Sequence, residues 1–187
     1  PVIPTSGDPP TAWLDVKRVS ELLRYVAGAS NVRWYVEKSP PGSKEISYIG
    51  PNRDGVASHV VFRFDYDRTV KAGGIYCACF CVDAAKQAGV RGRGAAAIDV
   101  SADGVTWVPL HNSIDSQQWG EQCVVERKLP EEVAGGRSVW VGVRLLTEGC
   151  DNGLYSTAQF GRTDSDLDQR VFSIFVELED APEEPAP

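Results

Sequence analysis

From residue 31 onward, short apolar runs follow one another and are separated by turn residues. In the range 58–66, Val60, Phe62 and Phe64 share one parity, which is the pattern of a half-buried antiparallel strand. The last such run repeats this alternation, with Glu177 on the parity that faces away from the core. The pattern predicts strands near 31–37, 45–49, 58–66, 74–83, 95–101, 105–110, 121–127, 138–146 and 171–179.

Residues 9–27 have a different period. Their apolar residues recur at steps of three and four, which is typical of a helix with one apolar face. These residues are Trp13, Val16, Val19, Leu22, Leu23 and Val26. Asp8 could cap the start of this helix, and Gly28 suits its end. We therefore expect a helix near 9–27, either as a lid on a sandwich or as an interface element.

Together these elements predict an all-β fold, because eight or nine short strands follow one another without a βαβ rhythm. We expect an antiparallel β-sandwich or jelly roll with one N-terminal helix, formed by residues 12–179 as a single domain. Residues 1–11 and 180–187 are rich in Pro with Gly, Ser or Glu. Such composition favours a linker or N-terminal extension and a linker or tail that tethers the unit to other domains. Packing of an end against a neighbouring subunit is the alternative.

Composition narrows the classes of partner. The chain has 187 residues, 42% hydrophobic and 24% charged, which is ordinary for a globular protein. Its net charge of -7 argues against nucleic acid or an anionic membrane surface as the main partner. No run reaches the roughly 20 apolar residues that a membrane helix needs, so membrane insertion is not expected.

The five cysteines leave the redox compartment undecided, since an odd number cannot all pair within one chain. Cys77, Cys79 and Cys81 alternate along one predicted strand and so share a face. Small buried side chains, or a disulfide such as Cys123 with Cys150, are both compatible with the sequence. A zinc site is disfavoured, because three thiols in steps of two along a strand spread over roughly 13 Å, too far for one tetrahedral ion.

The stretch from Val100 to Leu110 carries the strongest local signal. Asp103 and Gly104 lie between two apolar runs, and this dipeptide favours a two-residue type I′ hairpin. The stretch resembles a hairpin of galactose-binding-like β-sandwiches, a group that includes discoidin domains and many carbohydrate-binding modules. The runs 60–65 and 129–144 add to this resemblance, which covers roughly 58–179. It implies a noncatalytic module that binds glycans, lipids or proteins through loops at one end, often with a structural calcium ion.

Two loops hold the candidate ligand-binding residues, because a sugar site needs an aromatic wall and nearby polar groups. They are loop 111–120, with Trp119, His111, Asn112, Asp115 and Gln117, and loop 147–170, with Tyr155, Asn152 and Arg162. Trp119 folded back as a plug over the sandwich edge, and Tyr155 in simple loop packing, are the alternatives. Trp107 and Trp140 lie inside strand patterns, where we expect them to pack on sheets.

Asp164, Asp166 and Asp168 have the spacing at which a calcium loop begins. An EF-hand would continue with Gly and then Glu, where this chain has Gln169 and Phe175. The sequence is compatible both with an irregular calcium site and with a solvated acidic loop.

Catalysis is not expected. The chain has two histidines and lacks the common hydrolase and metalloprotease motifs. A glycosidase needs only two acids, however, for example Asp65 with Glu177. The leading hypothesis is a noncatalytic carbohydrate-binding or adhesion module of a secreted or cell-surface protein, with the periplasm as another location. The alternatives are an assembly subunit of an extracellular complex, which binds other proteins, and a carbohydrate-active enzyme that uses two acids.

Overall fold

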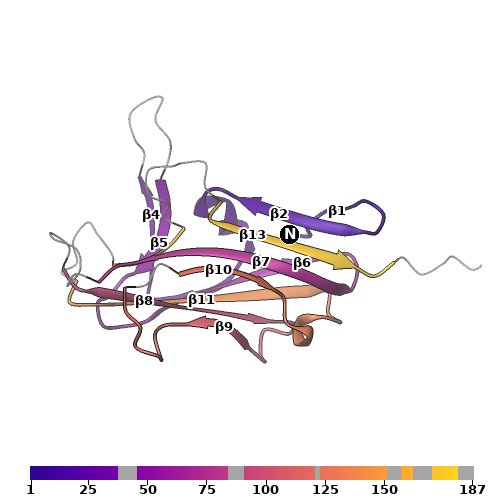
Figure 1. The fold of residues 1–187 in the computed structure, drawn as a ribbon. Helices are drawn as coiled ribbons and strands as arrows, with labels where there is room; N and C mark the ends of the chain where they lie inside the picture. Colours follow the sequence, from indigo (N-terminus) through magenta and orange to yellow (C-terminus); the bar gives the residue numbers. More distant parts are fainter. Residues whose placement is uncertain (38–45, 84–90, 121–122, 151–156, 162–169, 181–187) are drawn as a thin grey trace, which may run out of the picture.

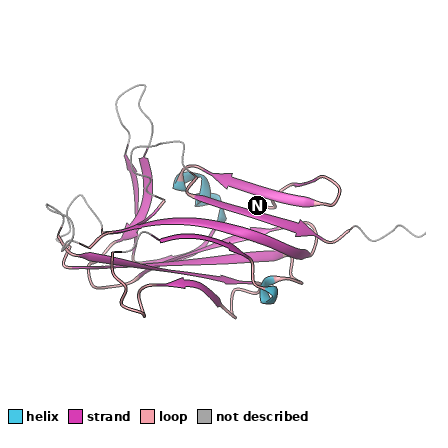
Figure 2. Cartoon of the chain, in the orientation of Figure 1, coloured by secondary structure: helices cyan, strands magenta, loops and turns pink. Residues whose placement is uncertain are grey.

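Two antiparallel sheets pack face to face in the computed structural model, which describes residues 1–37, 46–83, 91–120, 123–150, 157–161 and 170–180. Figure 2 shows that nearly all regular structure is strand. The eight-stranded sheet has the order β1 (Thr5–Ser6), β2 (Thr11–Val16), β13 (Phe172–Leu178), β7 (Val70–Cys81), β12 (Ala158–Phe160), β5 (Ile46–Pro51) and β4 (Val32–Glu37), and β10 (Cys123–Lys128) pairs with the other edge of β7. The five-stranded sheet has the order β3 (Val26–Ser30), β6 (Ser58–Asp65), β11 (Ser138–Glu148), β8 (Arg93–Ser101) and β9 (Val108–Asn112).

The core lies between the sheets and is rich in phenylalanine. Phe62 and Phe64 point inward from β6, and Phe160 and Phe172 point inward from the facing sheet. The ring centroid of Phe62 lies 5.8 Å from that of Phe160, and the ring centroid of Phe64 lies 5.2 Å from that of Phe172. These rings hold the sheets together, since aromatic side chains bury large apolar areas. The sandwich predicted from the sequence is confirmed, and each predicted strand overlaps an observed one.

The helix expected over residues 9–27 is wrong in extent. Residues 11–16 form β2, which pairs with β13 from Val16↔Phe172 to Thr11↔Glu177. Only Val19–Tyr25 is helical, as the 3-10 helix η1, and Gly28 lies in β3. The buried residues of η1 are Val19, Leu22 and Tyr25, at the three-residue spacing of a 3-10 helix. The apparent single period therefore joins a strand and a short helix, because pairing with a distant strand overrides local periodicity.

The first residues of the chain also take part in the fold. Residues 1–11, expected as a linker or extension, include β1, which pairs with β2. Ile3 is 2% exposed, and its backbone N–H donates to the carbonyl of Asp65. In Figure 1 the β1–β2 hairpin lies along β13 at one side of the sandwich. Of the predicted C-terminal tail, residues 181–187 lie outside the described residues.

The cysteines of β7 face the core. Cys77, Cys79 and Cys81 are buried thiols, in agreement with their expected role as small interior side chains. Cys150 is also a thiol, with its Sγ 3.0 Å from Thr157 Oγ1. The suggested Cys123–Cys150 disulfide is therefore absent from the structure.

The connection between β8 and β9 is longer than the predicted two-residue turn. The strands are joined by residues 102–107, and Gly104 has a φ of 75°. Asp103 does not share that conformation, so a type I′ turn is excluded. The Asp103 carboxylate organises the loop instead. It accepts backbone N–H hydrogen bonds from Thr106 and Val105, each at 2.8 Å, and a hydroxyl bond from Ser101 at 2.9 Å.

These hydrogen bonds give an expected pH dependence. The backbone N–H groups of Thr106 and Val105 hold the pKa of Asp103 below its ordinary value, so the folded loop favours the carboxylate. Stability from this group is present above the ordinary pKa and is lost as pH falls through the lowered folded pKa. We expect Asp103→Ala to unfold at lower temperature than the wild type at neutral pH, and the gap to close in acid. Asp103→Asn keeps an acceptor and should lie between them; a gap independent of pH would contradict the assignment.

Tyr66, which follows β6, buries its hydroxyl without a hydrogen-bond partner among the described residues. Burial also raises its pKa far above the ordinary range. A buried hydroxyl without a partner costs about 1–3 kcal/mol, so we expect Tyr66→Phe to keep or increase stability, by up to about 1 kcal/mol. Denaturant unfolding measures the difference. Tyr66→Ala must destabilise strongly if the ring belongs to the core, and a clear loss in Tyr66→Phe would show that the hydroxyl has a partner.

Candidate functional site

The outer face of the eight-stranded sheet carries two neighbouring exposed aromatic side chains. Phe175 of β13 pairs directly with Trp13 of β2 on one side and with Gly74 of β7 on the other. Trp13 is 65% exposed and Phe175 is 37% exposed. Directly paired residues of antiparallel strands share a face, so the two side chains lie next to each other on this surface. Large apolar side chains gathered on an outer face are typical of a binding surface.

Charged groups line the next row of the same face. Ser173 of β13 pairs with Tyr76 of β7, and Tyr76 pairs with Glu126 of β10. The guanidinium of Arg170 lies 4.2 Å from the ring centroid of Tyr76, and its Nη2 lies 3.7 Å from Glu126 Oε1. Arg170 thus offers hydrogen-bond donors and Glu126 offers acceptors at the same place. Their charges offset each other.

Between the two rows lies a shallow hollow of about 170 Å³. It is lined by Trp13, Gly74, Ile75, Tyr76, Glu126, Arg127, Arg170, Ser173 and Phe175. An apolar wall with a few fixed polar groups is the usual composition of a small-molecule site. We call the surface formed by Trp13, Gly74, Tyr76, Glu126, Arg170 and Phe175 the aromatic face.

The sequence held one overlooked signal for this surface. Phe175 occupies the parity of the last strand that otherwise carries Ser173 and Glu177, where a half-buried strand is expected to be polar. Trp13 has no such signal. The apolar period of residues 9–27 predicts a helix, with Trp13 on its buried side. Pairing of β2 with β13 places it outside instead.

The outer face of the five-stranded sheet is partly covered by the chain itself. The loop 102–107 lies over it, since a Cβ on Gly104 would be 3.1 Å from the Trp140 ring and a Cβ on Gly142 would be 3.2 Å from the Trp107 ring. The guanidinium of Arg63 lies 5.0 Å from the centroid of Trp140. Trp107 and Trp140 therefore pack on the sheet, as expected, and leave little aromatic surface for a ligand.

An ion pair and a histidine also lie on the outer face of the five-stranded sheet. Arg144 Nη2 lies 3.3 Å from Asp99 Oδ2. Burial lowers the pKa of His59, and the neighbouring Arg144 lowers it further. His59 is thereby held in its neutral form more strongly than an exposed histidine.

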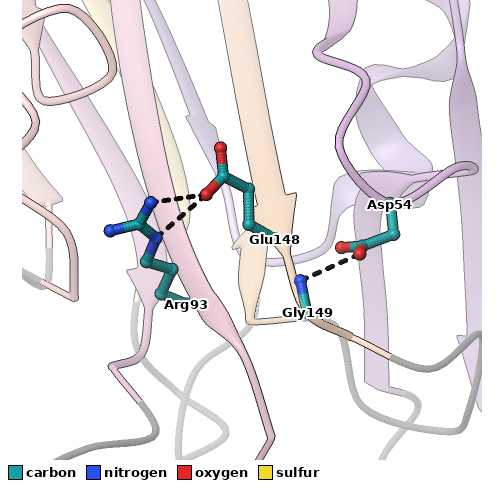
Figure 3. A network of polar contacts seen from close by, with 4 residues as sticks. All are labelled: Asp54, Arg93, Glu148 and Gly149. Atoms are coloured by element: carbon teal, nitrogen blue, oxygen red, sulfur yellow. Dashed lines mark hydrogen bonds and ion pairs between the residues drawn. The ribbon is translucent and has the colours of Figure 1, made fainter.

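Trp119, from loop 111–120, is half-buried next to the end of β11. The guanidinium of Arg93 lies 4.3 Å from its ring centroid, and Arg93 Nη2 and Nε donate to Glu148 Oε2 at 2.6 and 3.0 Å. Figure 3 shows the ion pair of Arg93 with Glu148, together with the Gly149 N–H that donates to Asp54 Oδ2 at 2.8 Å. The structure thus brings Trp119 to the first residues of loop 147–170. One face of the indole is covered by Arg93, which leaves less of it for stacking.

The polar residues of loop 111–120 bond mainly to one another. Asn112 Nδ2 donates to Asp115 Oδ2 at 2.6 Å, and the Asp115 N–H donates to Asn112 Oδ1 at 3.0 Å. His111 is half-buried, whereas Gln117 is exposed and has a φ of 56°. The ligand site expected here stays a prediction. Its other residues, Tyr155, Asn152 and Arg162, and the calcium candidates Asp164, Asp166 and Asp168, lie outside the described residues.

The suggested pair of catalytic acids is not supported. Asp65 lies on β6 in the five-stranded sheet, where it bonds to Ser138 and Arg63, and Glu177 lies on β13 in the other sheet. Both face away from the core, so the sandwich separates them and they do not converge on one substrate. Within the described part of the chain, no three His, Cys, Asp or Glu side chains gather as a metal site, and no helix is long and apolar enough to cross a membrane.

No family model matches this chain, and no curated protein matches it. Solved structures similar to it include TmCBM27, a carbohydrate-binding module described for specific mannan recognition. That similarity has 13% identity and a TM-score of 0.33, over 94% of this chain and 96% of the other. Another is a chain from work on the promiscuous specificity of carbohydrate-binding modules of the β-sandwich superfamily, with 10% identity and a TM-score of 0.35 over 88% of this chain and 60% of that one.

Proposed function

We propose that this protein is a noncatalytic module that binds a neutral carbohydrate on the aromatic face, as part of a secreted or cell-surface protein. The observation that carries the proposal is the exposed pair of Trp13 and Phe175 next to a hollow lined by polar groups. A sugar ring has one face of C–H groups and a rim of hydroxyls. The first stacks on an aromatic ring, and the second needs donors and acceptors at fixed positions.

The polar side of the hollow supplies both kinds of group. Arg170 has only donors and Glu126 only acceptors, so neighbouring hydroxyls of one sugar can bond to each. Arg170 Nη2 and Glu126 Oε1 lie 3.7 Å apart, whereas a good charged hydrogen bond is shorter, about 2.7–2.9 Å. Both side chains can therefore exchange this weak contact for hydrogen bonds to a ligand.

The charge balance favours a neutral sugar over an acidic or sulfated one. The cation of the aromatic face already has an anionic neighbour, since Arg170 pairs with Glu126. The whole chain carries a net charge of -7, which repels polyanions. Desolvating that ion pair for an anionic ligand would leave the Glu126 carboxylate without compensation.

A glycan array of the whole chain tests the proposal, with neutral and anionic glycans and with and without calcium. We expect binding to neutral glycans, lost in Trp13→Ala and kept in Trp119→Ala. Loss in Trp119→Ala alone would place the site on loop 111–120 and overturn the assignment to the aromatic face. Absence of binding to any glycan would reject the function, and light scattering would then test the alternative of an assembly subunit.

A further inference from the structure

Gly74 lies in the middle of β7 at the floor of the hollow. It pairs with Phe175 of β13 on one side and with Lys128 of β10 on the other. The row across the sheet therefore runs Trp13, Phe175, Gly74 and Lys128. Neighbouring strands are about 4.8 Å apart, so Gly74 is the next position along the row after the two aromatic rings, and it has no side chain above the backbone.

The packing of the protein does not require a glycine at this position. A Cβ on Gly74 would touch only the carbonyl oxygen of Arg127, at an ordinary 3.5 Å. The preceding residue differs, because a Cβ on Gly73 would lie 2.3 Å from the Phe175 carbonyl oxygen and 2.9 Å from Leu129 Cδ1. Gly73 is thus needed for close approach of the strands, whereas Gly74 is not. A glycine inside a strand weakens it, and often marks a place where a ligand approaches the backbone.

We propose that Gly74 forms a second sugar subsite, so that the module recognises a stretch of glycan chain that runs across the strands from Trp13 toward Lys128. One sugar stacks on Trp13 and Phe175, and the next lies against the bare backbone at Gly74, beside Arg170 and Glu126. The hollow extends across the strands along this row, since its lining includes residues from β2, β13, β7 and β10. This inference rests on the proposed function and adds that the ligand is an oligosaccharide rather than a single terminal sugar.

The test replaces Gly74 by valine, which fills the subsite and suits a strand better than glycine. Titration calorimetry uses mannose, glucose and xylose and their neutral β-1,4-linked oligosaccharides up to the hexasaccharide. In the wild type we expect affinity to rise with chain length, and in Gly74→Val we expect that rise to be lost, leaving the longest ligand about tenfold weaker. The monosaccharide, which occupies only the position on Trp13 and Phe175, should bind both proteins within about twofold.

Gly28→Val is the matched control. Gly28 lies on β3 in the other sheet, and a Cβ there meets nothing within 4 Å, so this variant should bind like the wild type. Thermal unfolding shows that each variant is folded. If the wild type binds no oligosaccharide, the proposed function fails. If the wild type binds but Gly74→Val keeps the gain from the monosaccharide to the longer chains, or weakens the monosaccharide as much as the longer chains, the subsite is wrong while the function stands.

Discussion

Replacement of Trp13 by alanine is expected to weaken glycan binding by about thirtyfold or more, which corresponds to about 2 kcal/mol. The reason is the position of the side chain. Trp13 is 65% exposed next to Phe175, so it offers a flat apolar surface that no other residue on this face replaces at the same place. Titration calorimetry with the best neutral glycan from the array measures the loss.

The stability of the fold should change little in Trp13→Ala. A side chain that is mostly exposed contributes little to packing, and the free energy of unfolding should fall by less than about 1 kcal/mol. Trp13→Phe keeps a ring and should retain part of the affinity. Trp119→Ala removes a tryptophan that has one ring face covered by Arg93, and it should bind like the wild type. Equal affinity of Trp13→Ala and wild type would show that the sugar binds elsewhere.

Replacement of Phe62 by alanine is expected to cost about 3–5 kcal/mol of stability and to lower the midpoint of thermal unfolding by roughly 10 °C. Phe62 is fully buried on β6 and its ring lies near those of Phe64, Phe160 and Phe172. Its removal leaves a cavity between the sheets, and the rings around it cannot close the space without moving either sheet. Chemical denaturation with urea measures the free energy.

Phe62→Leu is the control for volume, and it should cost less than about 1.5 kcal/mol. Loss of less than about 1 kcal/mol in Phe62→Ala would show that this ring does not join the sheets. Binding is the second control. Phe62 points inward and does not line the hollow, so any Phe62→Ala protein that remains folded should bind glycan with nearly wild-type affinity.

The strands that the sequence predicted well are those whose two faces differ. Val60, Phe62 and Phe64 on β6, and Val139 and Val141 on β11, alternate with more exposed residues because one side meets the core and the other does not. The Ala158–Phe160 segment escaped prediction for the opposite reason. All three of its residues are buried, so the alternation that reveals a strand is absent. β3 was missed because four of its five residues are exposed and small.

Like the strands, the residues of the candidate site differ in how well the local sequence reveals them. A tryptophan in a polar loop, such as Trp119, stands out in a sequence because its neighbours differ from it. Trp13 does not, because the residues at steps of three from it are also apolar and mimic a helix. Arg170 and Glu126 are far apart in the chain, and nothing in their local sequence links them. Only strand pairing brings Arg170 over Tyr76 and near Glu126.

The sequence alone determined the all-β class, most of the strands and the inward direction of their side chains, since alternation is a local consequence of strand geometry and burial. It also determined that Cys77, Cys79 and Cys81 share one face. The tertiary structure alone decided that residues 11–16 are a strand, that the turn at Asp103 is a longer loop, and that Asp65 and Glu177 lie on opposite faces. It also decided where the exposed aromatic rings meet. Each of these depends on which distant segments pair, and that choice is made by the free energy of the whole sandwich rather than by neighbouring residues.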